Sequence, residues 1–166
     1  MKIELKRISH NARLSEETYA FTADVWIDGV KAGEVQNAGH GGPDQWHPRE
    51  VEARIDAYAA TLPHTDVSDM YSDGQKHTME QSAEVLIANL VTAWLHEKEV
   101  KRALSKRILY TIAGKDGIYQ TKAIPAAQLK TLLASPETTT AKLKAEKVLN
   151  LLPVPEAVAL YIASAA

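Results

Sequence analysis

The glycine-rich run Asn37-Ala38-Gly39-His40-Gly41-Gly42-Pro43 constrains the fold of this chain more than any other stretch. It places three glycines and a histidine in four consecutive positions, directly after residues that alternate like a β-strand. Glycine supplies no packing and loses much conformational freedom on folding, so such a cluster indicates positive φ angles or the close approach of another group. Two interpretations follow. The run is either a tight turn from a strand to a helix, or a cradle of backbone N–H groups, with His40 beside it, for an anion, a nucleotide or a metal-bound water.

Residues 1–36 predict an antiparallel meander of three strands. Apolar and polar residues alternate over residues 2–9, which is the period of a half-buried strand. Asp28-Gly29 is a strong signal for the turn of a hairpin. The strand before this turn carries its apolar residues on one face and Trp26 on the other, and the strand after it, residues 30–36, leads into the glycine-rich run.

The middle of the chain predicts two helices separated by a loop. Pro48 opens the first helix, which ends before Pro63. Residues 64–77 are polar and form the loop. Thr78-Met79-Glu80-Gln81 has the pattern of a capping box and opens the longest helix, residues 78–105. The apolar stripe of this helix predicts nearly complete burial for three side chains: Leu86, Leu90 and Trp94.

The remaining residues predict a second hairpin and then helices only. Lys115-Asp116-Gly117 separates two apolar runs and indicates the hairpin, over residues 107–123. Helical patterns follow at residues 125–134, 137–152 and 156–163. We therefore expect an α+β fold, in which one antiparallel sheet combines the meander with the later hairpin and packs against the long central helix. The chain is a single domain over residues 1–166, or a domain with a helical C-terminal appendage at residues 124–166.

Composition narrows the classes of function. The chain has no cysteine, which excludes disulfides, thiolate catalysis and cysteine-ligated zinc. No apolar run is long enough to span a bilayer, and the sequence begins without an apolar signal segment, so we expect a cytoplasmic protein that does not bind membranes. The net charge of −2 does not indicate nucleic acid as a partner, although residues 1–74 carry −6 and residues 75–166 carry +4. This asymmetry is compatible with a charged partner or with a homo-oligomer.

The candidate binding residues surround the glycine-rich run, and none of them is assigned a catalytic role. His40, Asp44 and His47 are of metal-ligand types, and a metal site would need further ligands from His64, Asp66, Asp69 or His77. No tight metal template is present, and the run lacks the spacing of a phosphate loop, so no metal or cofactor is assigned. The predicted binding surface comprises Asn37, Gly39, His40, Gly41, Gly42, Asp44, Trp46 and His47.

Four short motifs in roughly residues 1–45 carry a resemblance to a known group of proteins. They are Ser15-Glu16-Glu17-Thr18, Phe21-Thr22-Ala23, Asp28-Gly29 and the glycine-rich run itself. Together they resemble the N-terminal region of small uncharacterised proteins encoded by bacteriophages and prophages. This resemblance implies the cytoplasm of a bacterial host and an accessory role, and it carries over no activity and no catalytic residue.

Two classes of function remain open at this level. The first is a non-enzymatic binding protein of a phage or mobile element, which binds a host protein or sequesters a nucleotide through a surface that includes the loop Gly39 to Gly42. The second is a metal-dependent hydrolase or phosphoesterase centred on His40 and His47. The first is favoured because the sequence lacks a closed catalytic constellation.

Overall fold

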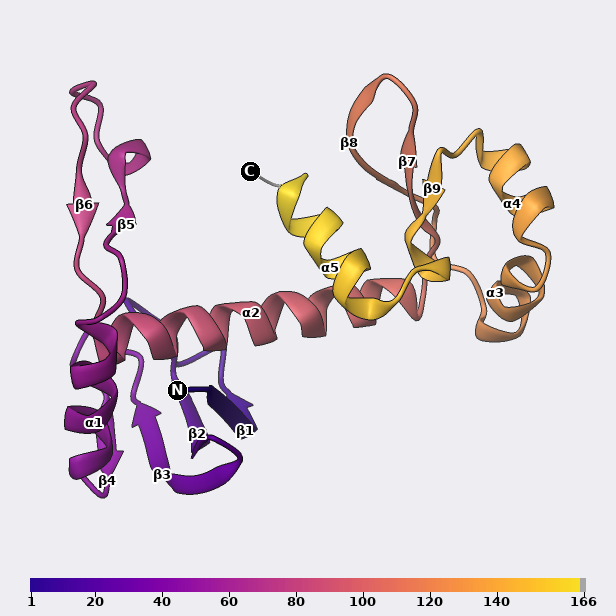
Figure 1. Ribbon diagram of the computed structural model, residues 1–166. Helices are drawn as coiled ribbons and strands as arrows, with labels where there is room; N and C mark the ends of the chain where they lie inside the picture. Colours follow the sequence, from indigo (N-terminus) through magenta and orange to yellow (C-terminus); the bar gives the residue numbers. More distant parts are fainter. Residues whose placement is uncertain (165–166) are drawn as a thin grey trace. The chain divides into compact units, whose positions relative to one another are not determined.

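The structure is a computed structural model that describes residues 1–164, except for the side chain of Asp69 (Figure 1). It has an antiparallel sheet near the N-terminus, a later hairpin in a second sheet, and helices at the C-terminus, which confirms the predicted α+β class. The chain divides into two compact units, residues 1–92 and residues 93–166, and the boundary lies inside its longest helix. We call them the N-terminal unit and the C-terminal unit. No helix among the described residues is long and apolar enough to cross a membrane.

The N-terminal unit is built on a four-stranded sheet of antiparallel neighbours. Its strands follow the order of the sequence: β1 (Ile3–His10), β2 (Phe21–Ile27), β3 (Val30–Asn37) and β4 (Gln45–His47). The first three form the predicted meander. The fourth is an addition, because the glycine-rich run leads back into a short strand instead of directly into a helix.

One face of this sheet forms the core of the N-terminal unit. Alternate residues of β2 are buried there, namely Phe21, Ala23, Val25 and Ile27. Helix α1 (Glu50–Ala59) buries Val51, Ile55 and Ala59. Helix α2 (Ala83–Leu104) begins in the same unit, beside α1, where the Ala83 N–H donates a 2.6 Å hydrogen bond to Asp56 Oδ1. We call this face of the sheet the inner face and the opposite one the outer face.

The start of α2 and its buried stripe both differ from prediction. Thr78 and Met79 belong to strand β6 (Thr78–Met79), which pairs with β5 (Thr65–Asp66) across the segment predicted as a loop, with the short helix η1 (Ser68–Met70) between them. The cap is Ser82, whose Oγ accepts the Val85 N–H at 3.2 Å. The buried residues of α2 are Ala83, Ile87, Val91 and, nearer its end, Val100, whereas Leu86, Leu90 and Trp94 are half-buried. Apolar residues cover most of the circumference of α2, so periodicity alone cannot choose between neighbouring stripes.

The C-terminal unit has a small sheet with the strand order β8-β7-β9. It consists of β7 (Leu109–Ile112), β8 (Lys115–Gln120) and β9 (Lys147–Val148). The hairpin turns at residues 113–114, two residues before the predicted Lys115-Asp116-Gly117 turn. The predicted single sheet is therefore wrong, because the hairpin pairs with β9 and not with the meander. A strand of two residues leaves too short a pattern to be found in the sequence.

Helices flank both faces of this second sheet. On one face, Leu109 packs with Val100 of α2, Leu149 of the short helix η2 (Leu149–Leu151) and Ala157 of α5 (Val154–Ala163). On the other, Ile108 and Val148 pack with Leu129 of α3 (Ala126–Leu133), and Leu143 of α4 (Pro136–Leu143) joins them. The helix predicted over residues 137–152 ends early because Lys144 is left-handed, with φ at 51°. The C-terminal unit thus includes the second hairpin and is not a purely helical appendage.

Asn150 connects three segments of the C-terminal unit. Its Nδ2 group donates to the carbonyl oxygens of Leu104, at 2.9 Å, and Arg107, at 2.8 Å, just after α2 ends. Its Oδ1 accepts the Leu109 N–H at 2.9 Å, where β7 begins. One side-chain amide therefore fixes the connection between helix and strand.

We expect Ile87→Ala to lower the free energy of unfolding by about 2–5 kcal/mol, because the Ile87 side chain is fully buried and its truncation leaves a cavity in the core. Leu90→Ala should cost less, since Leu90 is half-buried. Urea denaturation of the two variants measures the difference. A larger loss for Leu90→Ala would contradict the assignment of the buried stripe.

We expect Asn150→Asp to destabilise the protein by at least about 2 kcal/mol, because a carboxylate cannot donate to the two carbonyl oxygens that the amide serves. The control is Gln128→Glu, the same change of amide to acid at an exposed position on α3. Thermal and urea unfolding compare the two variants. Equal stability would show that Asn150 is dispensable.

Candidate functional site

The glycine-rich run supplies a hydrogen-bond acceptor, which is the reverse of the predicted cradle. The carbonyl oxygen of Gly39 accepts the N–H groups of Glu16, Glu17 and Thr18 at 2.9, 3.0 and 3.4 Å. Three consecutive N–H groups that point at one oxygen are the arrangement that binds anions elsewhere. Here the connection between β1 and β2 provides them, and the protein's own backbone fills the position.

The positions of two glycines explain why the run has this composition. Gly39 has a φ of +90°, and a Cβ atom there would lie 2.1 Å from the carbonyl oxygen of Leu14. Gly41 has a φ of +78°, and its Cβ would meet the Glu17 side chain at 2.1 Å. Backbone conformation disfavours side chains at both positions. At Gly39 the Leu14 backbone also leaves no space, whereas at Gly41 the exposed Glu17 side chain can move aside. The geometry therefore supports the tight-turn interpretation of the run.

Asn37 holds the run in place from the end of β3. The residue is only 8% exposed, and its amide makes four hydrogen bonds. Oδ1 accepts from Thr18 Oγ1 at 2.9 Å and from the Gly39 N–H at 2.8 Å, and Nδ2 donates to the Gly42 carbonyl and to Asp44 Oδ1, both at 2.9 Å. Sequence reasoning placed Asn37 on a binding surface, whereas its amide is engaged within the protein.

The two histidines of the predicted surface lie at different places. His40 is exposed, and its Nδ1 atom lies 3.1 Å from Glu16 Oε2. His47 lies on the outer face of the sheet, opposite Glu34 in the strand register. The two histidines line separate hollows. Among the described residues, no three histidine, aspartate or glutamate side chains come together as a group that could hold a metal ion.

Trp46 does not supply the exposed aromatic surface that the sequence suggested. It pairs with Val35 in the register of β3 and β4, and it is 9% exposed. Its Nε1 atom is buried and has no hydrogen-bond partner in the described structure. A partner cannot bury area on a side chain that the core already covers, so Trp46 is a core residue of the sheet.

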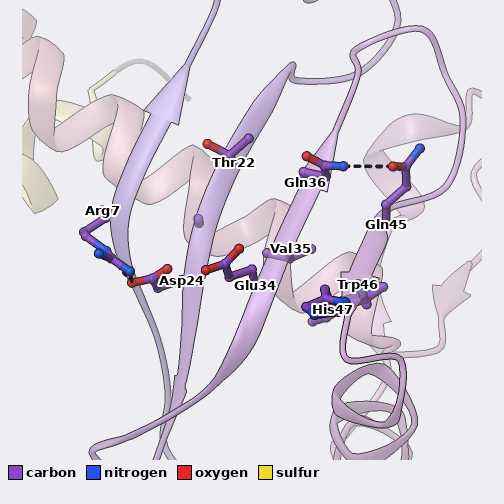
Figure 2. Close-up of a pocket in the computed structure, with 10 residues that line it drawn as sticks. Arg7, Thr22, Asp24, Glu34, Val35, Gln36, Gln45, Trp46 and His47 are labelled. Atoms are coloured by element: carbon purple, nitrogen blue, oxygen red, sulfur yellow. Dashed lines mark hydrogen bonds and ion pairs between the residues drawn. The ribbon is translucent and has the colours of Figure 1, made fainter.

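The outer face of the sheet presents two rows of polar side chains that cross all four strands. Figure 2 shows the members of both rows on β2, β3 and β4. The strand register aligns one charged row, consisting of Lys6, Asp24, Glu34 and His47. It aligns a second, uncharged row, consisting of Ser9, Thr22, Gln36 and Gln45. In the second row, Gln36 Nε2 donates to Gln45 Oε1 at 2.9 Å. All of these side chains are exposed except Asp24.

Asp24 is a nearly buried carboxylate, 6% exposed, held between two cations. Arg7 reaches it from an irregularity in β1, where φ is 50°, and Lys31 Nζ lies 3.1 Å from Asp24 Oδ1. Burial alone would raise the pKa of Asp24, but the hydrogen bonds from Lys31 and Arg7 outweigh it and hold the pKa below its usual value. A buried charge at the centre of a sheet face thus stays ionised.

The two rows border a hollow of about 510 Å³. This volume lies within the range of sites that hold small molecules or side chains of a partner. Sequence reasoning found only His47 and Trp46 among its lining residues, which also include Arg7, Thr22, Asp24, Glu34, Gln36 and Gln45. The polar residues at alternate positions of β2 and β3, which are visible in the sequence, indicate the remaining lining residues of these two strands.

Comparisons of the chain with protein-family models, with curated proteins and with solved structures find no match. A functional interpretation of the outer face therefore depends on its geometry and charge.

Asp44 predicts a pH dependence of stability. Burial raises its pKa, although the hydrogen bond from Asn37 acts in the opposite direction. Because the folded state then binds the proton more tightly than the unfolded state, the wild type loses stability as the pH rises through the folded pKa. An asparagine at this position cannot titrate, so the Asp44→Asn variant does not suffer this loss. The free energy of unfolding of the variant, relative to that of wild type, should therefore increase as the pH rises from about 3 to about 6.

Asp24→Asn is the matched control for Asp44→Asn, with the opposite sign. The lowered pKa of Asp24 stabilises the folded state above its unfolded pKa, so this variant should be less stable than wild type at neutral pH. The difference in stability between wild type and Asp24→Asn should shrink as the pH falls through the pKa of Asp24 in the folded protein. Thermal melts across pH 3–7 test both variants, and parallel pH profiles for the two would contradict the assigned environments.

Proposed function

We propose that this protein is a binding protein, which recognises a polypeptide segment of a partner on the outer face of its N-terminal sheet. The observation that carries the proposal is the pair of cross-strand polar rows beside a hollow of about 510 Å³. Many antiparallel sheets leave one polar face in water, so exposure alone would not support binding. The outer face differs from an ordinary solvated face because it also has the hollow and the fixed charges of Arg7, Asp24 and Lys31.

The uncharged row is suited to the main chain of a peptide. Gln36 and Gln45 each carry donor and acceptor atoms, and Thr22 adds a hydroxyl between β1 and β3. Side-chain amides can exchange their mutual 2.9 Å hydrogen bond for bonds to peptide groups without leaving either partner unsatisfied. The charged row, in turn, can pair with charged side chains of the segment.

Charge favours a basic or neutral segment over a nucleotide. The N-terminal unit contains 8 Lys or Arg and 15 Asp or Glu, which gives a net charge of −7. A field of this sign repels phosphate groups and attracts cationic partners. Of the two ligands considered from the sequence, a protein is therefore better supported than a nucleotide.

The glycine-rich run contributes to this proposal as a neighbour of the sheet face. It connects Asn37 at the end of β3 to Gln45 at the start of β4, and its residues 40–43 are exposed. The resemblance of residues 1–45 to phage-encoded proteins extends the proposal to a partner from the bacterial host. A hydrolase centred on His40 and His47 is less supported, because these histidines line separate hollows.

A site-specific photo-crosslinker tests the proposed surface. We expect a crosslinking amino acid at Thr22, on the outer face, to capture a partner that the same amino acid at Arg54, exposed on α1, does not capture. With the purified partner, Gln36→Ala combined with Gln45→Ala should weaken binding at least about tenfold, or about 1.4 kcal/mol.

The matched control for affinity is Glu50→Ala combined with Arg54→Ala, two exposed positions on α1. Titration calorimetry measures all three proteins, and thermal melts check that each variant is folded. Equal affinity of the glutamine variant and wild type would refute binding at the outer face, as would equal capture from positions 22 and 54.

A further inference from the structure

The two compact units carry opposite charge, which the net charge of the whole chain conceals. The C-terminal unit contains 11 Lys or Arg and 6 Asp or Glu, a net charge of +5, against −7 in the N-terminal unit. The net charge therefore changes sign between the two units, which meet at residues 92 and 93. A positive field of this size in a unit of 74 residues favours a polyanionic partner.

Some of these cations form a stripe on the part of α2 that belongs to the C-terminal unit. Lys98, Lys101 and Arg102 are exposed, and at about 100° per residue they share an arc of about 100° with Trp94. The opposite side of the helix packs into the core through Val100, with Ala103 and Leu104 beside it. We call Lys98, Lys101 and Arg102 the basic stripe.

The contacts of the basic stripe leave its charges available. Within the described residues, Lys98 and Arg102 take part in no salt bridge, while Lys101 pairs with Glu97 one turn away. Such an exposed pair contributes little to stability, so a ligand can replace it. Lys98 Nζ lies 4.7 Å from the centre of the Trp94 ring, which supports the ammonium group at the surface.

The helix dipole accounts for only part of the stripe. Cations are favoured in the last turn of a helix, and Lys101 and Arg102 lie there. Lys98 lies further from the end of α2 at Leu104, beyond the reach of that effect. The acidic Glu99 lies outside the stripe and accepts a 3.3 Å hydrogen bond from the Tyr161 hydroxyl. An uninterrupted row of cations thus runs along the exposed side of the helix.

We infer that the C-terminal unit binds the phosphate backbone of a nucleic acid through the basic stripe. Along the helix axis Lys98 lies about 4.5 Å from Lys101 and about 6 Å from Arg102, so the two ends of the stripe can contact neighbouring phosphates on one strand. The Arg102 guanidinium can bind a phosphate through two N–H groups, and the two lysines act as point charges. Because these contacts address phosphates and not bases, binding is independent of base sequence.

Fluorescence anisotropy with the full-length chain tests this inference. The probes are a labelled 20-base-pair DNA duplex of arbitrary sequence and a labelled single strand of the same length, at 50–300 mM NaCl. We expect Lys98→Gln, Lys101→Gln and Arg102→Gln combined to weaken binding at least tenfold. For the duplex, the slope of log affinity against log salt should fall by about 2.7 in magnitude, or about 0.9 for each of three lost phosphate contacts.

The matched control removes three other exposed cations of the same unit: Lys122→Gln, Lys130→Gln and Lys142→Gln. Both triple variants lower the net charge by the same amount, so only a specific role of the basic stripe predicts a larger loss for the first. Thermal melts check the fold. If the first variant melts lower than wild type, Lys98→Gln compared with Lys130→Gln provides the same test with a smaller change.

Three results would overturn the inference. One is no binding of either probe by the wild type at 50 mM NaCl. Another is an equal loss in the two triple variants, which would reduce the effect to net charge. The third is displacement of DNA by polyglutamate as effectively as by unlabelled DNA at equal charge, which would assign the stripe to an acidic protein partner. Preference between duplex and single strand identifies the form of nucleic acid.

Discussion

The N-terminal unit depends on one buried amide, the side chain of Asn37. Its four hydrogen bonds join the end of β3 to the β1–β2 connection through Thr18, and to the residues before β4 through Gly42 and Asp44. Because an amide both donates and accepts, no single acidic or aliphatic side chain could satisfy the same set. The carbonyl of Gly39 can therefore reach the N–H groups of residues 16–18, and the strand that carries Gln45 and His47 is held beside β3.

Asn150 plays the corresponding part in the C-terminal unit, where it joins the end of α2 to the start of β7. In both units the amide of one asparagine, buried at Asn37 and partly buried at Asn150, fixes an irregular connection. Buried polar groups are tolerated only when they are satisfied, so such connections admit few alternatives. The regular elements then present defined surfaces: the outer face of the first sheet and the basic stripe of α2.

These two surfaces differ in sign and in the ligands they suit. The outer face lies in a unit of charge −7 and offers amide and hydroxyl groups beside fixed ion pairs. The basic stripe lies in a unit of charge +5 and offers ammonium and guanidinium groups. The two proposals can be tested independently, because each concerns residues of one unit. Together they propose a polypeptide-binding surface in one unit and a phosphate-binding surface in the other.

The sequence by itself determined the elements whose signals are local. Alternation and the Asp28-Gly29 turn established the meander, and the glycine cluster established a special backbone at residues 39–42. Only the tertiary structure decided which contacts those elements make: that β9 pairs with the later hairpin, that Ile87 and not Leu90 is fully buried, that Trp46 belongs to the core, and that His40 and His47 lie apart. The physical reason is that periodicity specifies a face but not its partner. Strand register, burial and the convergence of polar side chains depend on residues that are distant in the chain.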